Sequence, residues 1–143
     1  MNARELMERS VERWNAHDEE GWSALFADNA TLTGPGGVRG SGAEIVAMFY
    51  GLWQQSFPDN QVRVIRLVAE DAQAVNEAVF EGTHTATLSA PGGEVPATGR
   101  SVTIPFVNVC EVSGDRFTDF VLYFDQVELM TQLGVGADAG GTT

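Results

Sequence analysis

The chain has 143 residues, of which 43% are hydrophobic and 9% aromatic, and its 20 acidic and 8 basic residues give a net charge of −12. This length suits one domain that buries a core without disulfides. The negative charge would repel phosphate backbones and anionic lipid, so we expect neither a nucleic-acid nor a membrane partner. All basic residues are arginines, which excludes Schiff-base chemistry on a lysine.

The cysteine and histidine content limits the possible disulfide and metal chemistry. Cys110 is the single cysteine, so no intrachain disulfide is possible and we expect a reducing cytoplasm. The first residues are charged and lack the apolar core of a signal peptide, and no apolar run approaches the ~18 residues of a membrane span. Two histidines and one cysteine, far apart, have no zinc-ligand spacing, so we expect no metal.

Helical patterns dominate the first part of the chain. Apolar periodicity predicts a helix over residues 3–16 and a short second helix, capped by Asp18, that carries Trp22, Leu25 and Phe26. A short strand over 31–33 and a Gly-Pro-Gly-Gly turn over 34–37 follow.

A third helix is predicted by its start signal and its apolar stripe. Residues from Ser41 to Glu44 have the pattern of a capping box, in which each side chain accepts a hydrogen bond from the other residue's backbone. The apolar stripe then follows at helical spacing: Ile45, Met48, Phe49, Leu52 and Trp53. Pro58 is expected to end this helix.

The remaining chain is predicted to be mostly β. We expect strands over 62–69, 75–88, 100–112 and 116–124, with Pro105 marking an edge or a bulge and Pro91-Gly92-Gly93 forming a turn. A short helix follows the last strand. Helices followed by a run of long antiparallel strands predict the α+β class, with one domain over residues 1–135 and a disordered tail over 136–143.

Asp125 lies where the last strand meets the last helix, and two roles are open for it. Asp125-Gln126-Val127-Glu128 fits a capping box, with the aspartate as N-cap. A lone acid at the end of a buried strand can also serve as the acid/base of a pocket. The roles are compatible, because a capping carboxylate can turn one oxygen toward a cavity.

Three further polar residues lie within the predicted strands. Alternation places His84 on the same face as Phe80, the face expected toward the helices, where it is either internally satisfied or a pocket donor. Asn108 is a single polar residue in an apolar strand and needs hydrogen-bond partners if it is buried. Tyr123 is either part of the core or part of a pocket wall.

Several short motifs follow one another along the chain. They begin with Trp14-Asn15-Ala16-His17-Asp18 and Leu25-Phe26-Ala27-Asp28-Asn29-Ala30. They continue with Phe80-Glu81-Gly82-Thr83-His84-Thr85 and Thr98-Gly99-Arg100, and end with Tyr123-Phe124-Asp125 and Gln132-Leu133-Gly134. In their order and spacing, over about residues 4–134, the chain resembles the SnoaL-like polyketide cyclases of the nuclear-transport-factor-2-like (NTF2-like) superfamily. The resemblance implies a cone in which helices pack on a strongly curved antiparallel sheet around a deep apolar pocket, a frequent homodimer and no cofactor.

For activity, the resemblance implies an intramolecular aldol ring closure of a polyketide-type substrate, or a related rearrangement. Asp125 would be the acid/base, and His84 and Asn108 would hydrogen-bond the enolate or carbonyl oxygen. The pocket between the third helix and the sheet is expected to bind a hydrophobic small molecule through five aromatic residues: Trp53, Phe49, Phe80, Phe106 and Tyr123.

Departures from the family pattern keep a second function open. Many relatives carry an acid or a histidine at Asn108, and a polar residue is common at Phe120. Ketosteroid isomerases of the same fold would need an aspartate near Gly34 and a tyrosine near Ser10, and both are absent. A non-catalytic small-molecule-binding or dimerisation domain is therefore the alternative.

Overall fold

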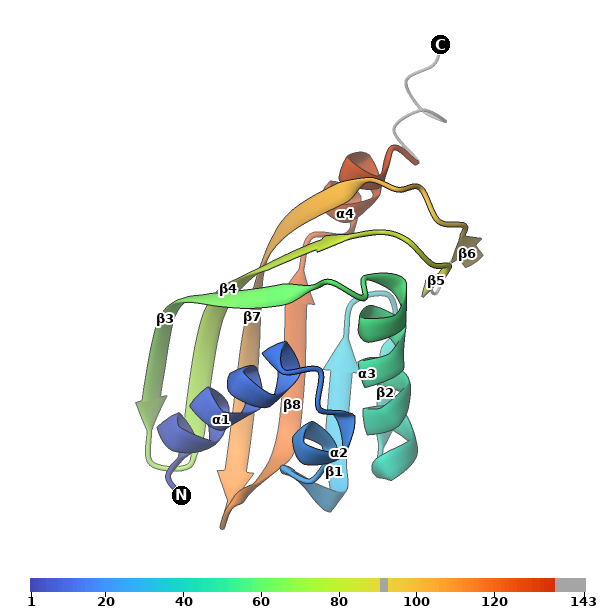
Figure 1. Ribbon diagram of the computed structural model, residues 1–143. Helices are drawn as coiled ribbons and strands as arrows, with labels where there is room; N and C mark the ends of the chain where they lie inside the picture. Colours follow the sequence, from blue (N-terminus) through green and yellow to red (C-terminus); the bar gives the residue numbers. More distant parts are fainter. Residues whose placement is uncertain (91–92, 136–143) are drawn as a thin grey trace.

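The computed structural model describes residues 1–90 and 93–135 and confirms the α+β class. Six strands form one curved sheet in the order β2-β1-β8-β7-β4-β3, and the first three helices lie on one side of it (Figure 1). The predicted tail over 136–143 and two residues of the predicted turn, Pro91 and Gly92, fall outside the described residues.

The predicted helices and long strands follow one another in the predicted order, and three short strands that were not predicted, at residues 38–41, 88–90 and 93–95, are added to them. The helices are α1 (Ala3–Asn15), α2 (Glu19–Ser23), α3 (Ala43–Ser56) and α4 (Gln126–Leu133). The strands of the large sheet are β1 (Phe26–Gly34), β2 (Val38–Ser41), β3 (Gln61–Glu70), β4 (Gln73–Thr83), β7 (Ser101–Ser113) and β8 (Arg116–Phe124). A separate hairpin is formed by β5 (Leu88–Ala90) and β6 (Gly93–Val95).

Two strand predictions needed correction. The strand predicted over 75–88 ends at Thr83, because the chain then leaves the sheet and the Thr85 N–H donates to the carbonyl of Ser56 at the end of α3 (3.1 Å). The strand predicted over 31–33 is longer and begins at Phe26, where the second helix was expected to continue. It pairs in parallel with β8, while the other neighbours in the sheet are antiparallel.

Pro105 lies in the interior of β7, a central strand. It pairs with Val79 of β4, whereas the ladder between β7 and β8 begins one residue later, at Phe106. Because β8 has already ended at Phe124, β7 is locally an edge at Pro105, which explains how a residue without a backbone N–H is accommodated there.

The predicted capping box of the third helix is wrong. Ser41 is the last residue of β2 and pairs with Thr31, so it cannot take the N-cap position. The N-cap is Gly42, whose φ of 92° suits glycine, and no side chain caps it. The buried face of this helix is also rotated relative to the predicted apolar stripe: Met48 is 52% exposed, while Val46 and Tyr50 are buried.

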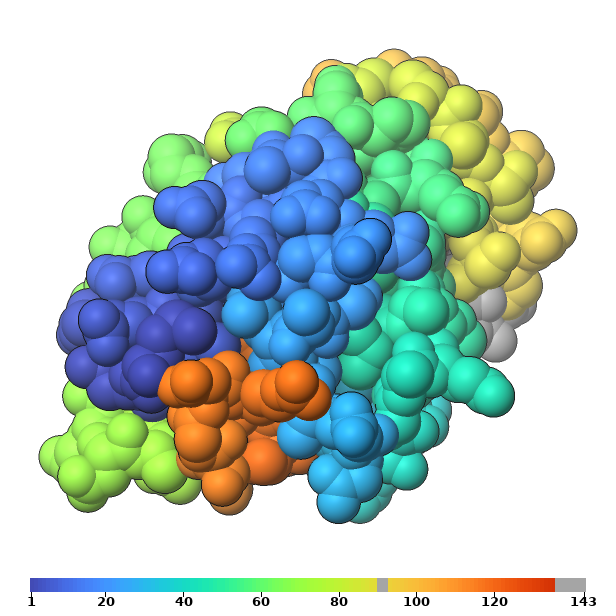
Figure 2. All heavy atoms as spheres, turned by 60° about the horizontal axis from the view of Figure 1, so that its bottom comes forward, coloured from blue at the N-terminus to red at the C-terminus, as the bar shows by residue number. Residues whose placement is uncertain are grey.

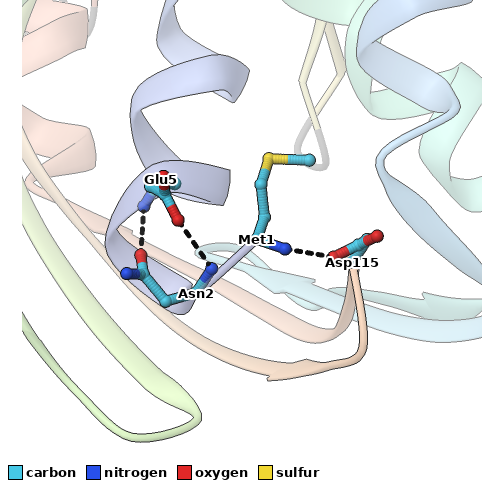
Figure 3. A network of polar contacts seen from close by, with 4 residues as sticks. All are labelled: Met1, Asn2, Glu5 and Asp115. Carbon is cyan, nitrogen blue, oxygen red and sulfur yellow. Dashed lines mark hydrogen bonds and ion pairs between the residues drawn. The ribbon is translucent and has the colours of Figure 1, made fainter.

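The first helix is anchored at its start. Asn2 and Glu5 form a capping box, and the amino group of Met1 pairs with Asp115 in the β7–β8 turn (Figure 3). Figure 2 shows this turn, in orange, beside the N-terminal helix on the same face of the molecule. The capping box satisfies backbone donors that the first turn of α1 would otherwise leave unpaired.

The end of α1 is tied to β3 and to the loop between α3 and β3. The Asn15 side chain both accepts from the Val62 N–H (2.7 Å) and donates to the Val62 carbonyl (2.8 Å). Next to it, the Trp14 indole N–H donates to Asn60 Oδ1 (2.7 Å). These bonds fix the Trp14 ring between the helices and the sheet.

Candidate functional site

A largely apolar pocket lies between the helices and the inner face of the sheet. The centre of a water-sized sphere can occupy about 70 Å3 of it, and about 640 Å3 is free of protein atoms when open solvent is counted. The lining residues come from α1, α2, α3, β3, β4, β7, β8 and α4: Ser10, Val11, Trp14, Trp22, Phe49, Trp53, Val62, Asn76, Phe80, Ile104, Phe106, Asn108, Phe120, Leu122, Phe124 and Leu129. The pocket therefore lies at the centre of the fold, where the elements converge.

Aromatic side chains form most of the wall and pack on one another. Trp22 stacks on Phe49, with ring centroids 6.0 Å apart, and meets Phe120 edge to face at 6.0 Å. Trp53 contacts Phe80 and Phe124 edge to face at 5.6 and 5.4 Å. Such contacts stabilise the wall beyond the effect of the area that they bury.

Two asparagines on adjacent strands supply most of the polarity of the pocket. Asn76 of β4 and Asn108 of β7 are direct cross-strand partners, and Asn76 Nδ2 lies 3.5 Å from Asn108 Oδ1. Asn76 is 0% exposed and its Oδ1 has no hydrogen-bond partner among residues 1–90 and 93–135. The third polar residue, Ser10, donates its hydroxyl to the Met7 carbonyl (2.7 Å).

The structure brings five of the eight predicted site residues into this lining. Trp53, Phe49, Phe80, Phe106 and Asn108 line the pocket. Tyr123 does not: it follows the inward-facing Leu122 by one residue, so its side chain lies on the outer face of the sheet and is 59% exposed.

Asp125 takes the capping position at the start of α4. Its Oδ1 accepts from the backbone N–H groups of Val127 (2.9 Å) and Glu128 (3.1 Å). The residue is exposed and does not line the pocket. Its chain neighbours Phe124 and Gln126 do line a second, adjacent hollow, which shares Phe49, Trp53, Leu122, Phe124 and Leu129 with the pocket.

His84 lies apart from both hollows, against the end of α3. It is 0% exposed and packs on Phe57, with ring centroids 5.3 Å apart. Its Nδ1 accepts from the Thr98 N–H (3.1 Å), which places the proton of the neutral ring on Nε2, and Nε2 has no partner within the described part of the chain. Burial lowers the pKa of His84.

The three residues predicted to be catalytic therefore do not converge on one cavity. None of the residues that line the pocket in the described ranges is ionisable near neutral pH. Nor does any cluster of three or more His, Cys, Asp or Glu side chains within 1–90 and 93–135 offer a metal site. The same residues contain no helix with the length and apolarity required to cross a membrane.

Two polar residues of the pocket, Asn76 and Ser10, were not predicted from the sequence. For Asn76 the signal was present, because it precedes Ala78 and Phe80 by two and four residues and so shares their face of β4. Because β7 pairs with β4, the inward face of β4 also determines which face of β7 points inward. That face carries Ile104, Phe106 and Asn108. Both faces of β7 are apolar, so the sequence pattern alone does not distinguish them.

Comparison with known families identifies the scaffold. The family model of the SnoaL-like domain matches residues 7–120. A comparison of the sequence with curated proteins finds no significant match.

Solved structures with the same fold are numerous. A candidate SnoaL-like polyketide cyclase from Jannaschia sp. CCS1 superposes with a TM-score of 0.80 at 18% identity, over 90% of this chain and 89% of that one. IdmH, a candidate polyketide cyclase from Streptomyces antibioticus, gives 0.76 at 25% identity, over 92% and 97%. A protein with a ketosteroid isomerase-like fold from Catenulispora acidiphila, solved with trimethylamine, gives 0.77 at 16% identity, over 94% and 95%.

Proposed function

We propose, from the premise that this chain belongs to the family of SnoaL-like domains, that it binds a small, neutral and largely apolar molecule in the pocket between its helices and its sheet. The observation that carries the proposal is the lining, in which aromatic and aliphatic side chains surround two amides and a hydroxyl. Apolar burial supplies affinity, and a few polar groups fix the orientation of the ligand. A charged ligand would lose its hydration there without meeting a counter-ion among the described lining residues.

The size of the pocket limits the ligand. The space of about 70 Å3 that the centre of a water-sized sphere can occupy is less than half of the ~150 Å3 of an engineered apolar cavity that holds benzene. One ring can therefore enter if the wall moves or if part of the ring stays in the mouth. The rest of a larger molecule would extend through the mouth.

Titration with ethylbenzene tests this proposal. All three tryptophans of the chain line the pocket, so saturable binding should change the tryptophan fluorescence. Ile104→Phe fills the pocket and should abolish the change, whereas Thr103→Phe, on the exposed face of the same strand, should preserve it. A wild-type protein whose emission shows no saturable response would refute the proposal.

A second candidate function is the intramolecular aldol closure of a polyketide-type substrate in a cytoplasmic biosynthetic pathway. Asp125 would take a proton from a carbon flanked by carbonyls, the resulting enolate would attack a second carbonyl, and the protonated Asp125 would return the proton to the new alkoxide. Support comes from the family and from the second hollow, which is lined by both chain neighbours of Asp125. Of the two proposed donors to the enolate, Asn108 lines the pocket and His84 does not.

A linear triketone in which a carbon between two carbonyls attacks the third carbonyl to form a six-membered β-hydroxy ketone is a suitable probe for this candidate. Closure that the wild-type protein accelerates and Asp125→Asn does not would support it. Closure at the same rate with both proteins would exclude Asp125 as the base, and no acceleration by the wild type would leave binding as the function.

We also propose a homodimer that forms through the outer face of the sheet. Val68, Val75, Val109 and Val121 form a continuous cross-strand row there, and the first three are 60%, 40% and 39% exposed. Tyr123 extends the same face. Contiguous apolar surface of this kind is typical of an interaction site.

A further inference from the structure

We infer that Asn76 and Asn108 act together to select a hydroxyl or enol group on the ligand. The inference rests on the proposed binding function and names the chemistry of the group that enters deepest. It makes Asn76 a specificity-determining residue, alongside Asn108.

The two amides form a small polar site within an apolar wall. Asn76 is fully buried and Asn108 is 6% exposed, and both line the pocket. Their contact, at 3.5 Å, is the only hydrogen bond that either side chain makes within the described residues. An amide offers two donor hydrogens and a carbonyl oxygen, so most of the capacity of the pair is unused.

The unused atoms are complementary. Asn76 Oδ1 is an acceptor without a partner among residues 1–90 and 93–135, and Asn108 Nδ2 is a donor. Turning both amides over exchanges the roles and leaves one free acceptor and one free donor again. The requirement on the ligand is therefore independent of how the two amides are oriented.

A hydroxyl or an enol meets this requirement with one oxygen, because it donates and accepts at the same atom. An ether or a carboxylate oxygen can only accept, and would leave the buried carbonyl unsatisfied, which is the costly arrangement. A carboxylate would in addition be stripped of water in a pocket without a cation. The favoured ligand is thus a neutral ring that carries a hydroxyl or an enolised carbonyl.

Isothermal titration calorimetry with matched probes tests the inference. The probes are para-ethylphenol, para-ethylanisole, para-ethylbenzoate and ethylbenzene. We expect the phenol to bind wild-type protein about tenfold more tightly than the anisole, the effect of one well-made hydrogen bond, and the benzoate to bind most weakly. In Asn76→Leu the ratio of the dissociation constant of the anisole to that of the phenol should fall to about one. Ile104→Val, which alters the apolar wall alone, should keep the wild-type ratio.

The outcomes separate this inference from the proposed function. If ethylbenzene binds and the phenol is not preferred over the anisole, the binding function stands and the inference is overturned. A preference that persists in Asn76→Leu also overturns it, because the hydroxyl is then recognised elsewhere. If no probe binds, the proposed function itself fails.

Discussion

Asn76 on β4 faces Asn108 on β7 across the ladder, and the single contact between their side chains leaves the buried Asn76 carbonyl oxygen without a partner in the described part of the chain. Native proteins rarely tolerate such a group, because burying an unpaired carbonyl costs about 1–3 kcal/mol. Its position in the wall of the pocket connects this cost to ligand binding, since a ligand that donates a hydrogen bond there offsets it.

Replacing Asn76 should therefore not harm the fold. In Asn76→Leu a buried amide with one long hydrogen bond becomes an apolar side chain of similar size, and we expect the free energy of unfolding to be unchanged or higher by about 1 kcal/mol. Urea denaturation of the ligand-free protein measures the change. A loss above about 2 kcal/mol would show that the amide is structurally required.

Asn60→Leu is the matched comparison for that variant. Asn60 is also fully buried, but its side chain accepts from Trp14 Nε1 and donates to Gln54 Oε1 and the Phe57 carbonyl. Removing it leaves several buried partners unpaired, so we expect a loss of at least about 2 kcal/mol in the same assay. Equal effects of the two substitutions would contradict the assignment of different roles to the two asparagines.

Two substitutions of Asp125 separate capping from chemistry. Asp125→Ala removes the acceptor for the Val127 and Glu128 N–H groups and should lower the free energy of unfolding by about 1 kcal/mol. Asp125→Asn retains a good N-cap and should lower the free energy of unfolding by only a few tenths of a kcal/mol. Both variants should bind ethylbenzene like the wild type, and weakened binding in Asp125→Asn would place the carboxylate in contact with the ligand.

His84 should make the stability depend on pH. Burial lowers its pKa below the ordinary value of 6.5, so below about pH 6.5 the unfolded chain binds more protons than the folded one. Stability should therefore fall as the pH is lowered from about 6.5 toward the folded-state pKa, and be fully present above 6.5. Urea midpoints across this range measure the slope, which His84→Gln should remove and His17→Asn should leave in place.

The proposed dimer is tested by analytical ultracentrifugation. Wild-type protein should sediment as a dimer, and Val109→Glu should yield monomers, because a charge would be buried in the centre of the interface. Val127→Glu, which alters an exposed valine of α4 away from the sheet, should leave the dimer intact. A wild-type monomer at all concentrations would refute this part of the proposal.

Much of the fold was predictable because local patterns determine it. The helical stripe of α1, the cap at Asp18 and the alternation in β8 each followed from a few neighbouring residues. The parallel pairing of β1 with β8 was not predictable, because it joins segments about ninety residues apart. The capping box at Ser41 failed for a related reason: pairing of Ser41 with Thr31 overrides the local signal.

The site was predictable in its apolar part and less so in its polar part. Alternation and helical spacing indicate which aromatic side chains face inward, so four of the five predicted aromatic residues line the pocket. The direction of a polar side chain at the end of a strand depends on tertiary contacts, as His84 shows by turning to Thr98. The Asn76–Asn108 pair depends on register between strands, which sequence alone does not specify.

The most direct test of the central claim, that this pocket takes a neutral ring with the asparagine pair at its hydroxyl, is a nuclear magnetic resonance titration of labelled protein with para-ethylphenol. The side-chain amide signals of Asn76 and Asn108 and the indole signals of Trp14 and Trp22 should shift together with one affinity, while the exposed Asn29 stays unchanged. Saturable shifts confined to residues outside the pocket, or no shifts at all, would contradict the account.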